Sequence, residues 1–190
     1  MIPAALVGSG LVLAYILKSG PSNTTRVRAA FDDREYQVQE LPHKQEAAEL
    51  LARLRGNLVK LRDEYKKSDG SLADPPIRRF VDRFNPDALI ENDMGSDSTA
   101  YSENKGDVIV VCLRDKSNPE FPLIEENTIM FVLLHEMAHL MTESIGHTPE
   151  FWSNFRKILQ DAIQAGIYTQ RNYAKSPVPY CGMTITDSPL

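Results

Sequence analysis

Hydrophobic and polar residues follow different periods in different parts of this chain, and each period predicts one kind of element. Between residues 44 and 67 the apolar positions recur at alternating spacings of four and three, which is typical of an amphipathic helix. Residues 34–41 alternate between apolar and polar side chains, and residues 107–114 contain a β-branched run, so both are predicted to be strands. A short helix that begins with proline is expected at 76–84.

One apolar run carries polar residues at a spacing that suits a metal ion. Residues 127–145 predict a helix that is buried nearly all round, and this helix contains His135, Glu136 and His139. Side chains four residues apart leave a helix on the same side, so the two imidazoles can reach a single Zn²⁺. Buried without a metal, these polar groups would stay unpaired at a high cost. His135 and His139 are therefore predicted to be zinc ligands, with the Glu136 carboxylate placed to take a proton from water.

A third zinc ligand is expected just after this helix. Gly146 suits the left-handed turn that ends a helix, and it directly precedes His147, which would fold back toward the metal. Glu143 lies one turn beyond His139 on the same helix face and is the competing candidate. Glu150 is a further alternative. The sequence thus leaves the third ligand open, with His147 preferred.

The charge balance limits the kinds of partner, and the cysteine count limits the disulfide bonds that the chain can form. The 190-residue chain has a formal net charge of −5, which argues against a large basic surface and against nucleic acid as a partner. Its two cysteines do not make a disulfide framework. Cys112 lies in an apolar run and is interpreted as a small core residue, and a bridge to Cys181 is the alternative. One of the tail tyrosines, Tyr168, Tyr173 or Tyr180, is a candidate donor to a reacting oxyanion, and Tyr168 is the nearest to the zinc motif in sequence.

The N-terminal residues predict a membrane anchor. Residues 2–17 contain no charged side chain. As a helix rising ~1.5 Å per residue they would span about 24 Å, and snorkelling by Lys18 would make up the difference from a ~30 Å bilayer core. We therefore expect an anchor at 1–18, a linker at 19–30 and a zincin-like domain at 31–190. The basic residues that follow the anchor place this domain on the cytosolic side of the membrane.

The zinc motif and its flank resemble a known family. His135-Glu-Met-Ala-His139, followed by Gly146-His147-Thr-Pro-Glu-Phe-Trp152, is similar to the WLM/SprT-like zinc metallopeptidases, in which a third histidine and an aromatic pair follow the His-Glu-x-x-His helix. The resemblance covers about residues 101–167 and implies a zinc peptidase. Phe151 and Trp152 are interpreted as core packing that fixes the His147 loop. Such domains are also encoded by large DNA viruses, sometimes behind an N-terminal anchor, which adds the virion as an expected location.

These expectations combine into one fold and two functions. The fold is α+β, with a small sheet packed on helices around the zinc helix and one membrane-anchor helix in front. The first function is a membrane-anchored endopeptidase that hydrolyses peptide bonds through zinc-activated water, with Glu136 as general base. Its partners would be a protein or peptide substrate, the lipid bilayer and other subunits of a viral or membrane assembly. The alternative is a structural component of such an assembly, for example a viral minor capsid protein that retains the peptidase-like domain.

The resemblance also gives a possible role to the strand predicted at 107–114. In zinc peptidases of this kind a strand beside the cleft commonly pairs with an extended substrate. As an edge strand, this segment would bind a peptide by adding it to the sheet. As a central strand, it would only support the fold. The sequence leaves both interpretations open.

Overall fold

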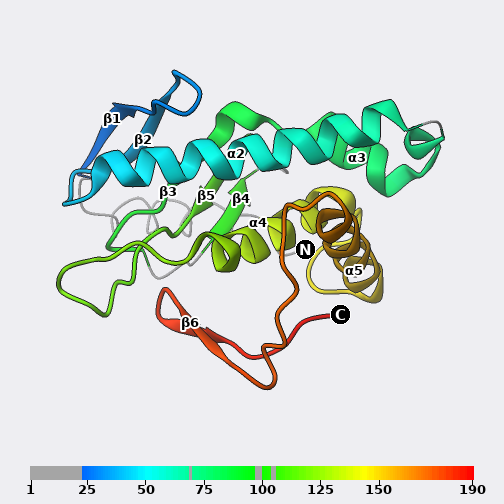
Figure 1. Cartoon of the computed structure of the whole chain (residues 1–190). Coiled ribbons are helices and arrows are strands. Elements are labelled where there is room, and N and C mark those ends of the chain that lie inside the picture. Colours follow the sequence, from blue (N-terminus) through cyan, green and yellow to red (C-terminus); the bar gives the residue numbers. More distant parts are fainter. Residues whose placement is uncertain (1–22, 69, 97–99, 104–105) are drawn as a thin grey trace, which may run out of the picture.

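The computed structural model describes residues 23–68, 70–96, 100–103 and 106–190 of the chain. In these residues four α-helices and three small sheets form an α+β architecture (Figure 1). The helices are α2 (Lys44–Lys67), α3 (Pro75–Arg83), α4 (Glu126–Met141) and α5 (Pro149–Gln164), with short 3₁₀ turns η1 (Ser71–Ala73) and η2 (Pro86–Ala88). The strands are β1 (Thr24–Arg28), β2 (Glu35–Gln39), β3 (Leu89–Glu91), β4 (Ala100–Glu103), β5 (Val108–Val111), β6 (Val178–Tyr180) and β7 (Met183–Ile185).

The amphipathic pattern of residues 44–67 produces α2, and the predicted bounds of this helix are confirmed. Its apolar stripe is buried, with Leu51, Leu54 and Leu58 all fully covered. Basic residues occupy its last turn, where they favour the negative end of the helix dipole. In Figure 1, α2 crosses the width of the molecule, with the β1–β2 hairpin near its beginning and α3 near its end.

The middle sheet has the strand order β3-β5-β4, so the strand predicted at 107–114 is central and β4 is an outer strand. β5 pairs in parallel with β3 and antiparallel with β4. Ile109 and Val111 are fully buried, which fits a β-branched run covered by helices. The possibility that β5 itself offers a free edge to a peptide is thereby corrected, because both of its edges are used inside the sheet.

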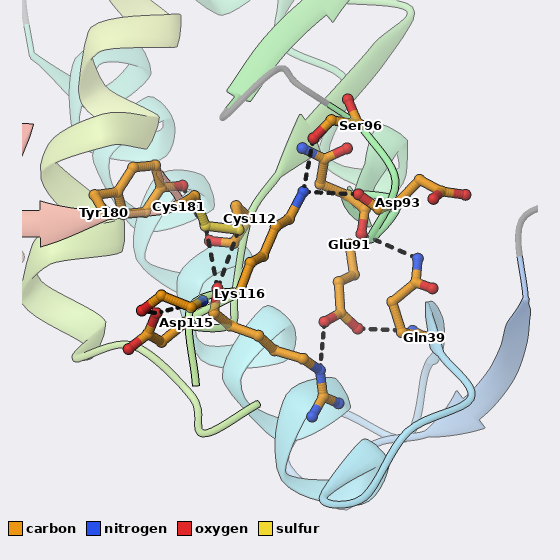
Figure 2. The surroundings of a disulfide bond; sticks show 12 residues. Gln39, Glu91, Asp93, Ser96, Cys112, Asp115, Lys116, Tyr180 and Cys181 are labelled. Atoms are coloured by element: carbon orange, nitrogen blue, oxygen red, sulfur yellow. Dashed lines mark hydrogen bonds and ion pairs between the residues drawn. A yellow bond between two sulfur atoms is a disulfide. The ribbon is translucent and has the colours of Figure 1, made fainter. Parts of the chain in front are cut away.

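A buried ion pair joins this sheet to β2. Arg114, just after β5, donates from Nε to Glu91 Oε1 at 2.7 Å, and the Gln39 backbone N–H donates to Glu91 Oε2 at 2.7 Å (Figure 2). The Arg114 and Glu91 side chains are only 1% and 2% exposed. Removing one partner of such a pair leaves the other charge buried and unpaired, which is costly. These contacts therefore hold three segments of the chain in place relative to one another.

Helix α4 forms the centre of the fold and packs against α3, α5, β4 and β5. Leu133, Leu134 and Met137 are fully buried, as the apolar run predicts. The helix ends at Met141, four residues before the predicted end at 145. Thr142 explains the early stop, because its hydroxyl donates to the Ala138 carbonyl at 2.7 Å while accepting from Asn154 Nδ2 at 2.9 Å.

The predicted membrane anchor at residues 2–17, and with it the membrane location facing the cytosol, needs correction. In the part of the chain that the structure describes, none of the helices combines the length and apolar character that crossing a bilayer requires. The anchor segment itself lies outside the described residues. Its sixteen uncharged residues fall short of a ~30 Å bilayer core, which weakens the sequence argument. The predicted linker at 19–30 is also wrong in part, because β1 lies within it and pairs with β2.

The C-terminal tail contains a hairpin that the sequence pattern did not reveal. β6 and β7 pair antiparallel with each other and form a separate two-stranded sheet. A disulfide between Cys181, in the turn of this hairpin, and Cys112, just after β5, joins the tail to the middle sheet (Figure 2). The two Cα atoms lie 6.4 Å apart, within the usual range for a disulfide. Cys112 is a core residue, 1% exposed, but its interpretation as an unbridged one is corrected.

Candidate metal centre

Helix α4 presents His135 and His139 on one side, as their spacing predicts. Their ring centroids lie 5.0 Å apart. Glu136 follows the first histidine and is buried, 7% exposed. The structure therefore places two imidazoles and one carboxylate in the last turns of one helix, where the packing of α4 fixes their directions.

His147 reaches the same place from the loop after α4. Gly146 has a φ of +84°, the left-handed conformation expected of it, and this turn directs the next residue back toward the helix. The His147 ring centroid lies 4.9 Å from that of His135 and 5.1 Å from that of His139. Nε2 of His147 lies 3.0 Å from Nε2 of His135. The third histidine thus joins the first two.

The three histidines fit a metal ion. Ring nitrogens from His135, His139 and His147 all lie within 4.8 Å of one another, the arrangement of a group that can hold one ion. Tetrahedral zinc with bonds of about 2.05 Å to nitrogen separates its ligand nitrogens by about 3.3 Å. The 3.0 Å between the nitrogens of His135 and His147 is close to that separation.

The competing ligand candidates are used elsewhere. Arg79 of α3 donates to Glu143 Oε1 at 3.2 Å, and Glu143 is not in the three-histidine group. Glu150 accepts from the Ser144 hydroxyl at 2.7 Å and from the Glu143 and Ser144 backbone N–H groups at 3.1 and 3.2 Å. Its carboxylate therefore closes the loop that carries His147.

The Phe151 ring packs against all three imidazoles. Its ring centroid lies 4.9 Å from that of His135, 4.4 Å from that of His139 and 4.7 Å from that of His147. Phe151 is fully buried, so its interpretation as packing for the His147 loop holds. Trp152 differs, because it is 45% exposed and lines the cleft beside the histidines. Its interpretation as core packing is corrected.

Two arginines of α3 hold the end of α4, a role that was not among the expectations from the sequence. Arg79 Nε donates to the Met141 carbonyl at 2.6 Å, and Arg83 Nη1 donates to the Leu140 carbonyl at 2.9 Å. These carbonyls belong to the last helical turn, whose C=O groups have no N–H partner within the helix. The signal was present, because arginines four residues apart lie on one helix face and can cap a neighbouring helix together.

Burial shifts the pKa of two groups of the centre, His135 and Glu136. Desolvation, with smaller effects of His139 and His147, lowers the pKa of His135 to about 3, so its imidazole is neutral and able to ligate a metal at neutral pH. Desolvation raises the pKa of Glu136 to about 7. A carboxyl group with a pKa near neutrality can both accept and return a proton.

A cleft of about 1180 Å³ opens onto the histidines and Glu136. Its walls come from α4, the loop at 144–147, α5, β4, the β6–β7 hairpin and the residues that follow it. Tyr180 of the hairpin lines the cleft, and its hydroxyl donates to the Cys112 carbonyl at 3.0 Å. Tyr168 does not line the cleft and packs against Phe131. The candidate oxyanion donor chosen by its closeness in sequence is therefore not at the site.

The fold and the site define an α+β protein with a candidate three-histidine metal centre in an open cleft. No protein-family model matches the chain, and no solved structure matches it. It is 29% identical over 189 residues to "Uncharacterized protein R325" of Acanthamoeba polyphaga mimivirus, covering 98% of this chain and 95% of that protein. It is 33% identical over 136 residues to "Uncharacterized protein 042R" of Invertebrate iridescent virus 3, covering 70% and 75%. The chain belongs to the same family as this iridescent virus protein.

Proposed function

We propose that this protein is a zinc-dependent endopeptidase of the WLM/SprT-like type. The observation that carries the proposal is the convergence of His135, His139 and His147 in a cleft that also contains Glu136. Structural zinc sites generally have four protein ligands, whereas catalytic sites have three and keep one position open. The group found among the described residues has three. The donor set therefore favours catalysis over a structural role.

Each residue of the centre has a defined task in this proposal. The three imidazoles would hold zinc, which supplies a Lewis acid that activates water and polarises the scissile carbonyl. Glu136 accepts a proton from the attacking water and passes it to the leaving amine. Its burial keeps the carboxylate basic enough for the first step and its acid strong enough for the second. Phe151, Arg79 and Arg83 keep the ligand-bearing segments in place.

The outer strand β4 supports a polypeptide as the substrate. Residues Ala100, Tyr101 and Ser102 line the cleft, and β4 is an outer strand of its sheet. An extended peptide that paired with this strand would lie in the cleft that also contains the histidines. The same arrangement does not require a basic surface, in keeping with the net charge of −5.

The proposal is tested with Glu136→Gln in the full chain. Zinc content, measured by mass spectrometry, should equal that of the wild type, and hydrolysis of denatured casein should fall at least about a hundredfold, the usual contribution of a general base. Undiminished hydrolysis by this variant would exclude the mechanism.

The third ligand is tested by zinc content in two further variants. His147→Ala should lose zinc, while Glu143→Ala should retain one ion per chain, because Glu143 pairs with Arg79 outside the histidine group. A folded wild-type protein that binds no zinc would remove the endopeptidase proposal altogether.

A further inference from the structure

The β6–β7 hairpin has little of its own to hold it in position. Its strands pair only with each other among the described residues, through Val178 with Ile185, Pro179 with Thr184 and Tyr180 with Met183. A single two-stranded hairpin is at best marginally stable in water. Its turn is well formed, because Cys181 and Gly182 both have positive φ values, 45° and 84°. The position of the hairpin therefore depends on its attachments to the rest of the protein.

Those attachments are the burial of Tyr180 and Ile185, which are 1% and 7% exposed, and a group of contacts at the turn. The disulfide bonds Cys181 to Cys112, and the Tyr180 hydroxyl donates to the backbone carbonyl of the same Cys112 (Figure 2). Both sulfur atoms lie against the Arg114 carbonyl oxygen, at 3.3 and 3.2 Å. Arg114 is held by its buried pair with Glu91. The hairpin is thus fastened at one end to a rigid part of the core, and after the hairpin Arg156 Nε donates to the Pro189 carbonyl at 2.8 Å.

The hairpin forms a wall of the candidate active site. Tyr180, Met183, Thr184 and Ile185 line the same cleft as His135 and Glu136, and residues 186–189 continue that wall. β4 contributes to the cleft from a different sheet. A molecule bound at the histidines therefore contacts two sheets, and the hairpin joins the core only through side chains such as Tyr180 and Ile185 and through the disulfide.

The cleft also gathers exposed apolar side chains. The described residues include five exposed large hydrophobic side chains, and three of them, Ile145, Trp152 and Met183, line this cleft. Exposed apolar groups gathered at one place commonly mark a binding surface. Met183 is 48% exposed and stands on the hairpin, while Ile145 and Trp152 belong to the loop after α4 and to α5. A bulky apolar side chain of a bound peptide suits these neighbours.

We infer that the β6–β7 hairpin recognises an apolar side chain of an extended peptide, and that the Cys112–Cys181 disulfide sets the affinity by holding the hairpin in place. The choice of a peptide rests on the proposed function. A dithiol reductant gives up two electrons and two protons, the Cys112–Cys181 bond breaks into two thiols, and the dithiol closes to its own disulfide. Either new thiol can donate to the Arg114 carbonyl, which already lies beside both sulfurs.

Reduction then lowers the affinity by lowering the fraction of molecules that carry the complete wall. If the freed hairpin is displaced about nine-tenths of the time, the apparent affinity falls about tenfold. The histidines are positioned by α4, Gly146 and Phe151, none of which belongs to the hairpin. Zinc content is therefore expected to stay unchanged.

The test uses full-length, zinc-loaded Glu136→Gln, which binds a peptide without cleaving it. Two fluorescein-labelled ten-residue peptides of Gly, Ser and Thr serve as probes, one with a central Leu and one with Ser in its place. Fluorescence anisotropy is measured for oxidised protein and for protein reduced with dithiothreitol and desalted without oxygen. The oxidised protein should prefer the Leu peptide, and reduction should weaken that binding about tenfold. Cys181→Ala should reproduce the reduced state without any reductant.

Two matched variants distinguish a role of the hairpin in binding from a general effect on the stability of the protein. Met183→Ser should weaken binding of the Leu peptide about fivefold, whereas Leu72→Ser, at an exposed apolar residue of η1 outside the cleft, should not change it. Hydrogen exchange should accelerate on reduction in residues 178–189 and stay unchanged in α2. Equal acceleration in both would make the disulfide a general stabiliser and overturn the inference.

The outcomes distinguish this inference from the proposed function. Equal affinity in the two redox states, or no binding by the oxidised protein, overturns the role of the hairpin even if the wild type hydrolyses casein. If the Leu peptide binds in a redox-dependent way but the wild type hydrolyses nothing, the inferred role of the hairpin is supported and the endopeptidase proposal is excluded.

Discussion

The metal side of the cleft and its hairpin side differ in how they are fixed. On the metal side, two candidate ligands share one helix, the third lies eight residues after the second, and Phe151 packs against all three rings. On the hairpin side, the disulfide spans 69 residues of sequence, and the strands pair only with each other in the described part of the chain. Residues close together in sequence thus form the chemical centre, whereas contacts between distant segments, the disulfide above all, position the wall that faces it.

The largest effect is expected from breaking the metal side directly. His139→Ala removes one of the three candidate ligands, so in the proposed enzyme zinc affinity should fall more than about a hundredfold and hydrolysis should disappear. His43→Ala is the matched control, because His43 is the fourth histidine, directly precedes α2 and lies beside Glu46, away from the three-histidine group. Titration with a chromogenic zinc chelator measures both variants. Equal zinc affinity in the two would show that the three rings do not hold the metal.

A smaller effect is expected from the aromatic support behind the ligands. Phe151→Leu leaves all three histidines but loosens their packing, so zinc affinity should fall about tenfold, the lower end of the range for residues that orient ligands. Loss of part of a buried ring should also cost roughly 1–3 kcal/mol of unfolding free energy. Trp152→Leu, at the neighbouring half-exposed position, should lower zinc affinity less, because the Trp152 ring centroid lies 5.8 Å from that of His147, farther than the 4.7 Å of Phe151. Chelator titration and urea unfolding measure the pair, and a larger loss from Trp152→Leu would contradict this assignment.

The smallest effect concerns the loop that carries His147. Hydrogen bonds from the Ser144 hydroxyl and the Glu143 and Ser144 N–H groups, together with Arg79, lower the pKa of Glu150 to about 2. Because the folded value lies below the ordinary one near 4.5, this carboxylate stabilises the fold above about pH 4.5, and the contribution is lost as pH falls through about 2. The amide NMR signals of Glu143 and Ser144 in metal-free protein should titrate with a midpoint near 2. A midpoint near 4.5, or an unchanged titration in Glu150→Gln, would show that the Glu150 carboxylate does not hold this loop through these hydrogen bonds.

The same contrast explains which features could be predicted from the sequence. The bounds of α2 and the grouping of His135, His139 and His147 follow from helical periodicity and a glycine turn, which act over a few residues. The hairpin strands have three residues each, too few for a period, and Pro179 lies within one of them. The pairing of Cys112 with Cys181 depends on the tertiary fold.

The positions of the strands within the middle sheet could not be predicted from the sequence. The strongest β-branched run became the central strand β5, while the outer strand β4 is a polar four-residue segment. Which strand lies at an edge is decided by pairing between distant segments and cannot be read from one strand alone. The predicted anchor failed for a different reason, because an uncharged run is a weak signal when it is shorter than a bilayer is thick.

The capping of α4 by Arg79 and Arg83 also bears on the order in which the protein assembles. Arg79 contacts the end of α4, the loop at Glu143 and the start of α5 at Glu150, so the third ligand is held only when α3, α4 and α5 have docked together. A helical segment that carries only His135 and His139 offers an incomplete set of ligands. For the proposed zinc enzyme, tight metal uptake would therefore be a late event in folding, and the rate at which a refolding chain takes up zinc would report the docking of three helices.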